Sequence, residues 1–238
     1  SSPSTIVRMC AHTGYSGYKE FRRDVTYELA RREQDLRGRK QEIQHSDSLE
    51  QIIDKITDAN ILSLEETREL MDVEVLRSSV EVIRRSRVIY LFGMGASLCA
   101  AKDAYLKFLR LNKLCIINED WHSQLVQSFN ATAQDAALVF SYSGATAEVI
   151  ECMKNLKHRG TPMIAIPRCI QSPVSDLADY KLYTAANESL FRSGAMSSRM
   201  SQLNVVDILL TALANADYDQ SVDQLSRTHI VKGEKTQK

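Results

Sequence analysis

The sequence predicts an α/β protein built on a doubly wound, five-stranded parallel sheet, preceded by a small all-helical segment. From residue 88 onward, five short apolar runs alternate with segments that are long enough for helices. The residues before them carry caps and apolar spacings typical of helices. With 238 residues and 44% hydrophobic content, the chain can bury one sizeable core and a small appendage.

The first 47 residues are expected to form two helices and a linker. Ser2 and Pro3 indicate a helix start, and Gly14 supplies the stop. Residues 17–32 place apolar side chains on one stripe of a second helix, and the residues after them are polar and charged. The predicted domains are residues 1–33, a linker at 34–47, and residues 48–230.

Two packing helices and the sheet follow the linker. Ser48 is expected to cap a long helix, and Asp72 is expected to cap a further one. The strands are expected at residues 88–92, 114–117, 136–140, 163–166 and 180–183. Helices are expected at residues 98–111, between the later strands, at residues 195–216, and near the C-terminus.

Residues 141–146, with the sequence Ser-Tyr-Ser-Gly-Ala-Thr, place three hydroxyls and a glycine directly after an apolar run. A strand that ends this way and leads into a helix brings hydroxyls and backbone N–H groups to one point, where the helix adds partial positive charge. The loop has no Lys or Arg and lacks the GxxxxGK[ST] pattern. It therefore predicts a phosphomonoester held by neutral donors, although the same residues also suit a plain polar turn.

A second loop of the same design follows the first strand, at residues 93–97. The carboxyl ends of neighbouring parallel strands line one ligand site, so Ser97 and the loop at 141–146 are expected to hold one small molecule between them. The Gly93-x-Gly95 spacing also occurs in dinucleotide folds. Leu98 stands where the third glycine of that pattern would be, so we reject a dinucleotide site.

Composition argues against several other classes of function. No apolar run approaches the length of a membrane span. The five cysteines are widely scattered with no C-x-x-C pair, which favours a reducing cytoplasm. We expect a cytoplasmic protein with no membrane partner, no metal ion and no cofactor.

Charge is balanced overall but not along the chain. The whole chain has 30 basic and 30 acidic residues. The first forty residues contain nine basic and five acidic ones, a net charge of +4, so the remainder carries −4. This asymmetry indicates that the N-terminal part contacts a polyanion.

Three stretches of the chain, residues 92–97, 140–146 and 188–199, resemble the RpiR/MurR family of bacterial transcriptional regulators. The resemblance spans nearly the whole chain. It implies that the large domain is a sugar isomerase (SIS) domain, a flavodoxin-like three-layer fold that binds phosphosugars. It also implies that residues 1–33 are the second half of a helix-turn-helix domain, and that the protein is a homodimer or tetramer.

The resemblance assigns roles to individual residues of the SIS domain. Ser141, Ser143 and Thr146 match the hydroxyls that hold the phosphate, with the Gly144 backbone beside them, and Ser97 matches a serine on the sugar side.

The resemblance assigns three further residues to the sugar, and each of them also has a simpler structural interpretation. Glu188 matches an acidic residue near the sugar, Arg192 or Ser193 borders the same pocket, and His122 follows the second strand, where polar side chains enter such pockets. Alternatively, Glu188 caps or salt-bridges a neighbouring arginine, His122 is a surface histidine, and Arg192 lies on a solvated face.

The resemblance makes residues 2–13 the recognition helix of the DNA-binding domain. Ser4, Thr5 and Arg8 share one face there and are expected to reach base edges or phosphates of a double-stranded operator, while Lys19 is expected to contact phosphates. A basic, solvated helix pair is the alternative interpretation.

Three hypotheses for function follow from these residues. The leading one is a non-enzymatic transcriptional regulator that senses a phosphorylated sugar. The second is a SIS enzyme, a phosphosugar isomerase or etherase, with Glu188 or Glu148 as general base. The third is a structural or protein-binding module.

Overall fold

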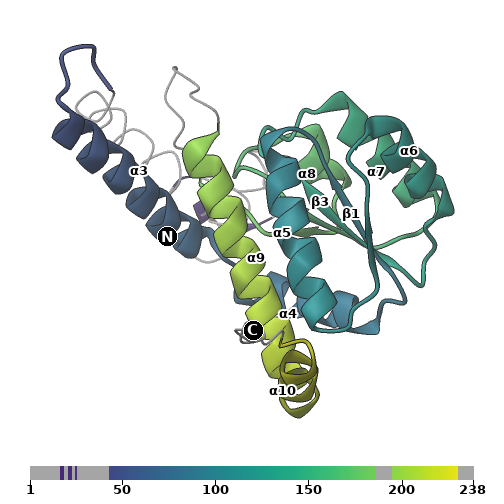
Figure 1. Cartoon of the computed structure of the whole chain (residues 1–238). Coiled ribbons are helices and arrows are strands. Elements are labelled where there is room, and N and C mark those ends of the chain that lie inside the picture. The colour runs from purple at the N-terminus through teal and green to yellow at the C-terminus, as the bar shows by residue number, and fades with distance from the viewer. Residues whose placement is uncertain (1–16, 19–20, 23–24, 26–42, 186–194, 230–238) are drawn as a thin grey trace, which may run out of the picture.

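The computed structural model describes residues 17, 18, 21, 22, 25, 43–185 and 195–229 (Figure 1). Its centre is a five-stranded, all-parallel sheet with the strand order β2-β1-β3-β4-β5. The predicted fold class is confirmed. The strands are β1 (Ile89–Gly93), β2 (Cys115–Ile117), β3 (Ala136–Phe140), β4 (Met163–Ile166) and β5 (Tyr180–Lys181).

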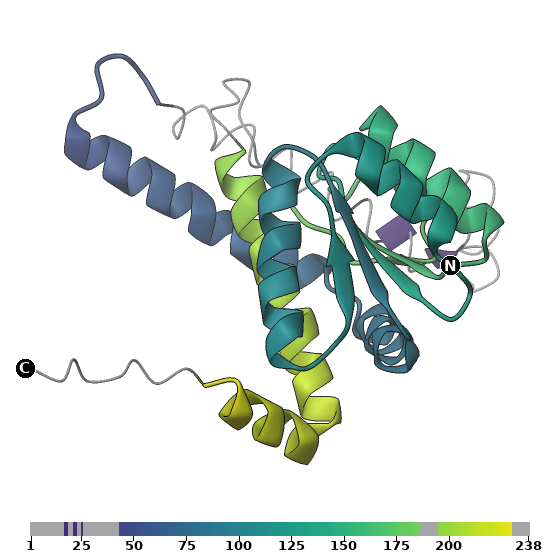
Figure 2. The same cartoon turned by 45° about the vertical axis from the view of Figure 1, so that its right-hand side comes forward.

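Helices cover both faces of the sheet. The side chains of one face pack with Ala104 and Phe108 of α5, Ile83 of α4 and Leu209 of α9. The other face packs with helices α6, α7 and α8 (Figures 1 and 2). The bounds of these elements are α4 (Val73–Arg85), α5 (Ala96–Arg110), α6 (Trp121–Asn130), α7 (Ala147–His158), α8 (Pro173–Leu177) and α9 (Met196–Ala216).

The two helices expected before the sheet begin at the predicted caps. The side chain of Ser48 accepts a hydrogen bond from the Gln51 backbone at the start of α3 (Leu49–Leu70), and Asp72 caps α4. Helix α3 crosses α9 and projects beyond the sheet in both views (Figures 1 and 2). The short C-terminal helix is α10 (Tyr218–Arg227), and no described helix is long and apolar enough to cross a membrane.

The last strand is shorter than predicted and ends at Lys181 rather than at residue 183. The chain still runs beside β4, because the Thr184 N–H donates to the Pro167 carbonyl and Thr184 forms an isolated bridge with Arg168. Pro167 has no N–H, so it cannot donate to a ladder, and regular pairing ends there.

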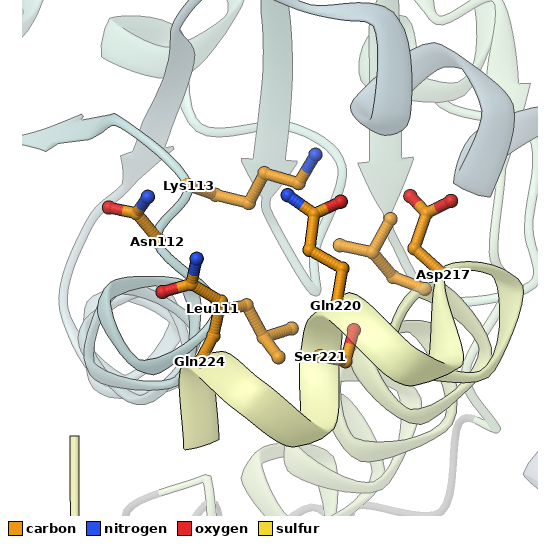
Figure 3. A pocket seen from close by; sticks show the side chains of 8 residues that line it. Leu111, Asn112, Lys113, Asp217, Gln220, Ser221 and Gln224 are labelled. Atoms are coloured by element: carbon orange, nitrogen blue, oxygen red, sulfur yellow. The ribbon is translucent and has the colours of Figure 1, made fainter. Parts of the chain in front are cut away.

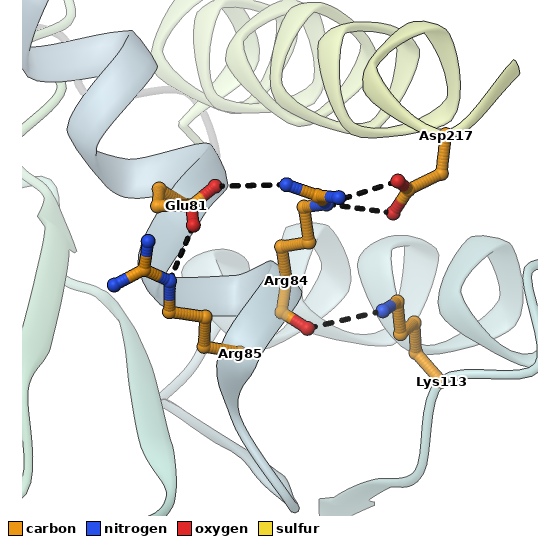
Figure 4. A network of polar contacts seen from close by, with 5 residues as sticks. All are labelled: Glu81, Arg84, Arg85, Lys113 and Asp217. Atoms are coloured by element: carbon orange, nitrogen blue, oxygen red, sulfur yellow. Dashed lines mark hydrogen bonds and ion pairs between the residues drawn. The ribbon is translucent and has the colours of Figure 1, made fainter.

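Charged side chains connect three elements near the amino end of the sheet. Arg84 on α4 donates from Nε to both carboxylate oxygens of Asp217, at 2.9 and 3.0 Å, which ties α4 to the junction of α9 and α10 (Figure 4). Glu81 pairs with Arg84 and Arg85, and Lys113 donates to the Arg84 carbonyl at 3.5 Å. These residues join α4, the α5–β2 turn and α10 at the end of the sheet away from residues 141–146.

Asp135, just before β3, is the most deeply buried acid in this region. Its side chain has 0% exposure and accepts from Arg87 Nε and Nη2 at 3.0 and 3.1 Å, and from the Thr132 backbone and hydroxyl at 2.9 and 2.8 Å. Burial raises the pKa of this carboxyl, but the hydrogen bonds from Arg87 and Thr132 outweigh it and the pKa lies below its usual value.

We predict that Asp135→Asn lowers the free energy of unfolding by about 1–3 kcal/mol at pH 7, because the Arg87 and Thr132 donors lose a charged, buried acceptor. The folded-state pKa lies below the unfolded value of about 3.9, so the carboxylate stabilises the fold above that pH. This contribution is lost as the pH falls through the folded-state pKa. In urea unfolding, the difference between wild type and variant should therefore shrink between pH 7 and pH 3.

Asp223→Asn is the matched control, because Asp223 pairs with Arg227 on the exposed surface of α10. It should change the free energy of unfolding by less than about 0.5 kcal/mol. If the difference in the free energy of unfolding between wild type and Asp135→Asn is the same at pH 7 and pH 3, stability is not linked to the ionisation of Asp135.

Candidate functional site

Three hydroxyls converge in the loop between β3 and α7, residues 141–146, which we call the hydroxyl loop. Thr146 Oγ1 lies 3.4 Å from both Ser141 Oγ and Ser143 Oγ. These separations are long for O–H···O bonds, so the hydroxyls keep most of their bonding capacity for another partner. The Ser143 and Thr146 N–H groups likewise make no hydrogen bond within the described part of the chain.

Helix α7 begins at this loop and α5 begins at the loop after β1, both without side-chain caps. Thr146 is the N-cap of α7 and Gly95 the N-cap of α5, and neither makes a side-chain capping bond. The described helices α9 and α10 also lack side-chain caps, whereas α3, α4, α6 and α8 are each capped by a Ser or Asp side chain. Uncapped helix N-termini leave backbone donors and partial positive charge available to an anion.

The structure brings Ser97 to the same place. The Tyr142 N–H donates to Ser97 Oγ at 3.4 Å, which joins the first turn of α5 to the hydroxyl loop. The two loops follow β1 and β3, the central pair of the sheet, where the strand order reverses. In open α/β sheets ligands bind at the carboxyl ends of the strands at such a switch point.

Gly144 fixes the path of the hydroxyl loop. It has φ +65°, and a Cβ there would lie 2.2 Å from Ser172 Oγ and 2.5 Å from Ser172 Cβ. Ser172 is the N-cap of α8, and the Val174 N–H of that helix donates to the Gly144 carbonyl at 3.1 Å. The loop therefore packs directly on the start of α8, and only glycine fits at this position.

Sequence reasoning missed Arg168, the cation that lies against the hydroxyl loop. Its backbone N–H donates to the Tyr142 carbonyl at 3.1 Å, and its guanidinium carbon lies 5.8 Å from the centre of the Tyr142 ring. Arg168 Nε is buried and has no hydrogen-bond partner among the described residues. The only signal in the sequence was its position two residues after an apolar run, at the carboxyl end of β4.

Gln124 on α6 was also missed, and it holds the ends of two strands. Its Oε1 accepts from the Gly93 N–H at 3.1 Å, while its Nε2 donates to the carbonyls of Gly93 and Asn118 at 3.0 and 2.9 Å. The side chain is 1% exposed. It fixes the glycine from which the β1 loop departs, so it positions Ser97 indirectly.

Two of the remaining predicted residues, His122 and Glu148, lie on the first turns of helices. His122 is exposed on the first turn of α6. Glu148 lies on the first turn of α7, where a carboxylate stabilises the helix N-terminus. Six predicted site residues lie outside the residues that the structure describes: Ser4, Thr5, Arg8, Lys19, Glu188 and Arg192.

A pocket of about 50 Å³ lies at the opposite end of the sheet, between the α5–β2 turn and α10 (Figure 3). Lys113, Asp217 and Gln220 project toward it, and its other lining residues are Leu111, Asn112, Leu213, Ser221 and Gln224. This volume holds a few water molecules at most. Asp217 is already bound to Arg84, so we interpret this pocket as part of the packing between α10 and the domain.

Comparison with known proteins identifies the family. Residues 82–212 match the SIS domain. An uncharacterized HTH-type transcriptional regulator of Caldanaerobacter subterraneus is 34% identical over 96% of this chain and 80% of its own length. The chain belongs to the SIS-domain transcriptional regulators. These findings confirm the SIS domain and the relation to transcriptional regulators that the resemblance implied.

Solved structures agree with this assignment. The NanR protein of Vibrio vulnificus, complexed with ManNAc-6P, has a TM-score of 0.71 and 27% identity, over 96% of this chain and 80% of its own. The sugar isomerase domain of an RpiR transcription factor from Sphaerobacter thermophilus has a TM-score of 0.68 and 20% identity, over 74% of this chain and 97% of its own. The second likeness supports the SIS fold alone.

We predict that Gly144→Ala destabilises this SIS regulator more than Gly160→Ala does. Both glycines have positive φ, +65° and +69°, but a Cβ at Gly160 meets its nearest atom at 3.8 Å. Gly160→Ala should therefore cost only the backbone strain, about 1–2 kcal/mol. Gly144→Ala adds the collision with Ser172 and should cost at least about 1 kcal/mol more in urea unfolding. Equal losses in the free energy of unfolding for the two variants would mean that Ser172 moves aside without an energetic cost.

Proposed function

We propose that this regulator senses a phosphorylated sugar at the hydroxyl loop and alters its DNA affinity in response. The observation that carries the proposal is the convergence of Ser141, Ser143 and Thr146 at two uncapped helix N-termini. Neutral donors of this kind suit a phosphomonoester. The ManNAc-6P complex of NanR makes N-acetylmannosamine 6-phosphate the first ligand to test.

Within this proposal the residues have separate tasks. The three hydroxyls and the free N–H groups of Ser143 and Thr146 bind the phosphate, and Ser97 contacts the sugar side. The Gly144 backbone lies beside them, and its N–H donates to the Ser141 carbonyl at 3.1 Å within the loop. Arg168 supplies positive charge beside the loop, which the neutral donors lack. Glu188, Arg192 and His122 are assigned to the sugar hydroxyls or their substituents.

The output of the proposed switch is DNA binding through the N-terminal segment. Ser4, Thr5 and Arg8 contact base edges or phosphates of a double-stranded operator, and Lys19 contacts phosphates. Operator affinity should then fall steeply with salt concentration. Sensing requires only that the sugar phosphate binds two arrangements of the protein with different affinity, so we assign no catalytic residue and place the protein in the cytoplasm.

We further propose that the protein is a homo-oligomer. Exposed apolar side chains are concentrated on the elements that border the edge strand β2: Leu106, Leu109, Leu114, Ile116, Trp121, Val126 and Phe129. Exposed apolar surface of this kind is typical of association between subunits. A monomeric mass in sedimentation equilibrium would contradict this proposal.

Thermal-shift titration tests the ligand. N-acetylmannosamine 6-phosphate should raise the melting temperature, because a ligand that binds only the folded state stabilises it, whereas unphosphorylated N-acetylmannosamine should not. Ser143→Ala should weaken binding about tenfold or more, since it removes a hydrogen bond to a charged group. Ser226→Ala, an exposed serine on α10, is the matched control. Sugar phosphates that leave both the melting temperature and operator affinity unchanged would refute the proposal.

The alternative function, a phosphosugar isomerase or etherase, predicts turnover. We expect no interconversion when the protein is incubated with aldose and ketose phosphates and the products are followed by NMR. A general base would have to be placed beside the sugar, and Glu148 and Glu188 are the two candidates. Turnover that is abolished by Glu148→Gln or Glu188→Gln would establish an enzyme instead.

A further inference from the structure

Helix α3 buries two hydroxyl side chains where it meets the SIS domain. Ser63 and Thr67 are both 0% exposed, and they are the buried residues of the helix. Buried hydroxyls need hydrogen-bond partners, and each of these two has one partner outside the helix. The contact of α3 with the domain therefore depends on directional polar bonds.

Each of these hydroxyls connects α3 to a different segment. Thr67 Oγ1 accepts from the Ala185 N–H at 3.1 Å and donates to the Ser63 carbonyl at 2.7 Å. The Ser63 and Ser201 hydroxyls are 2.8 Å apart, so α3 and α9 are joined as well (Figure 1). We call Ser63, Thr67 and Ser201 the hydroxyl seam.

The Thr67 bond is the last of a series that begins at the hydroxyl loop. The Arg168 N–H donates to the Tyr142 carbonyl at 3.1 Å inside that loop, and the next N–H, of Cys169, donates to the Thr184 carbonyl at 3.0 Å. The following residue, Ala185, donates to Thr67. Consecutive backbone groups thus lead from the loop after β3, through the loop after β4, to α3.

Both ends of the segment that contains Glu188 and Arg192 are tied to this helix. Ala185 precedes the segment and bonds to Thr67, while Ser197 follows it and donates to Asn60 Oδ1 at 3.2 Å. In the sequence, helix α3 follows the predicted linker at residues 34–47. It therefore contacts the chain on both sides of the segment that contains Glu188 and Arg192, and it is the first long helix after the predicted DNA-binding segment in the sequence.

We propose that Thr67 is a positioning residue that couples sugar phosphate binding at the hydroxyl loop to helix α3. This inference rests on the proposed function. Because the Ala185 N–H is buried and has Thr67 as its acceptor, a shift of the chain after β5 must either move α3 with it or break this bond. A seam of hydroxyls can exchange partners between two arrangements, whereas interlocked apolar side chains resist such a change.

Hydrogen exchange on the full chain, with and without N-acetylmannosamine 6-phosphate, tests the coupling. In the wild type the ligand should slow exchange in residues 141–146 and change exchange in residues 49–70. Thr67→Val keeps the shape of the side chain but removes its hydroxyl. In this variant the ligand should still slow exchange in residues 141–146. The ligand-induced change in the exchange of α3, which we call its response, should be about fivefold smaller, the factor that one net hydrogen bond is worth.

Two further variants distinguish coupling from general destabilisation. Thr67→Ser keeps the hydroxyl and should restore the response of α3. Thr161→Val is the matched control, because Thr161 is also buried but donates to the Thr132 carbonyl at the amino end of β4. It should leave both responses at the wild-type level. Ser63→Ala breaks the next bond of the seam and should weaken the response of α3 even if Thr67→Val fails to fold.

The possible results separate the two proposals. A protected loop with an unresponsive α3 in the wild type, or an undiminished α3 response in both Thr67→Val and Ser63→Ala, would overturn the coupling and leave the proposed function standing. If no sugar phosphate binds or protects the loop in the wild type, the proposed function fails, and the coupling fails with it.

Discussion

The constraint on which the rest of the structure depends is the complete burial of β1 and β3. Every residue of these two central strands is buried, so both faces of the sheet must be covered by helices. Helices on both faces leave only the ends of the strands accessible. At the carboxyl ends, the connections from β1 and β3 diverge to α5 and α7, and the polar groups of both loops collect where they part.

The features that depend on local sequence could be predicted from the sequence. The apolar runs gave β3 and β4 with their observed bounds, and Ser48 and Asp72 marked the starts of two helices because capping uses side chains close in sequence. The hydroxyl loop was found for the same reason, since its donors lie within six consecutive residues. Its grouping with Ser97 required only the rule that parallel strands end on the same edge.

Contacts between distant segments could not be predicted in the same way. Arg168 and Gln124 occur in stretches with no motif, and their importance appears only when β4 is placed beside β3 and α6 beside β1. Ser63 and Thr67 would be expected on the solvated side of a helix, since hydroxyl residues are mostly exposed. Their burial follows from where α9 and the chain after β5 lie, which helical spacing cannot give. The shortening of β5 is caused by Pro167, which follows β4 in the sequence. A residue next to one strand therefore limits the length of the neighbouring strand.

The two edges of the sheet have a consequence for how copies of this protein can associate. The edge strands β2 and β5 contain three and two residues, the shortest in the sheet. Open strand edges are the usual templates for intermolecular β-pairing and aggregation, and edges this short offer few unpaired backbone groups. Copies of the domain should therefore meet through side chains on helices rather than through a continuous intermolecular sheet. Such contacts can slide and repack without breaking backbone ladders, which suits the two arrangements that the proposed switch requires.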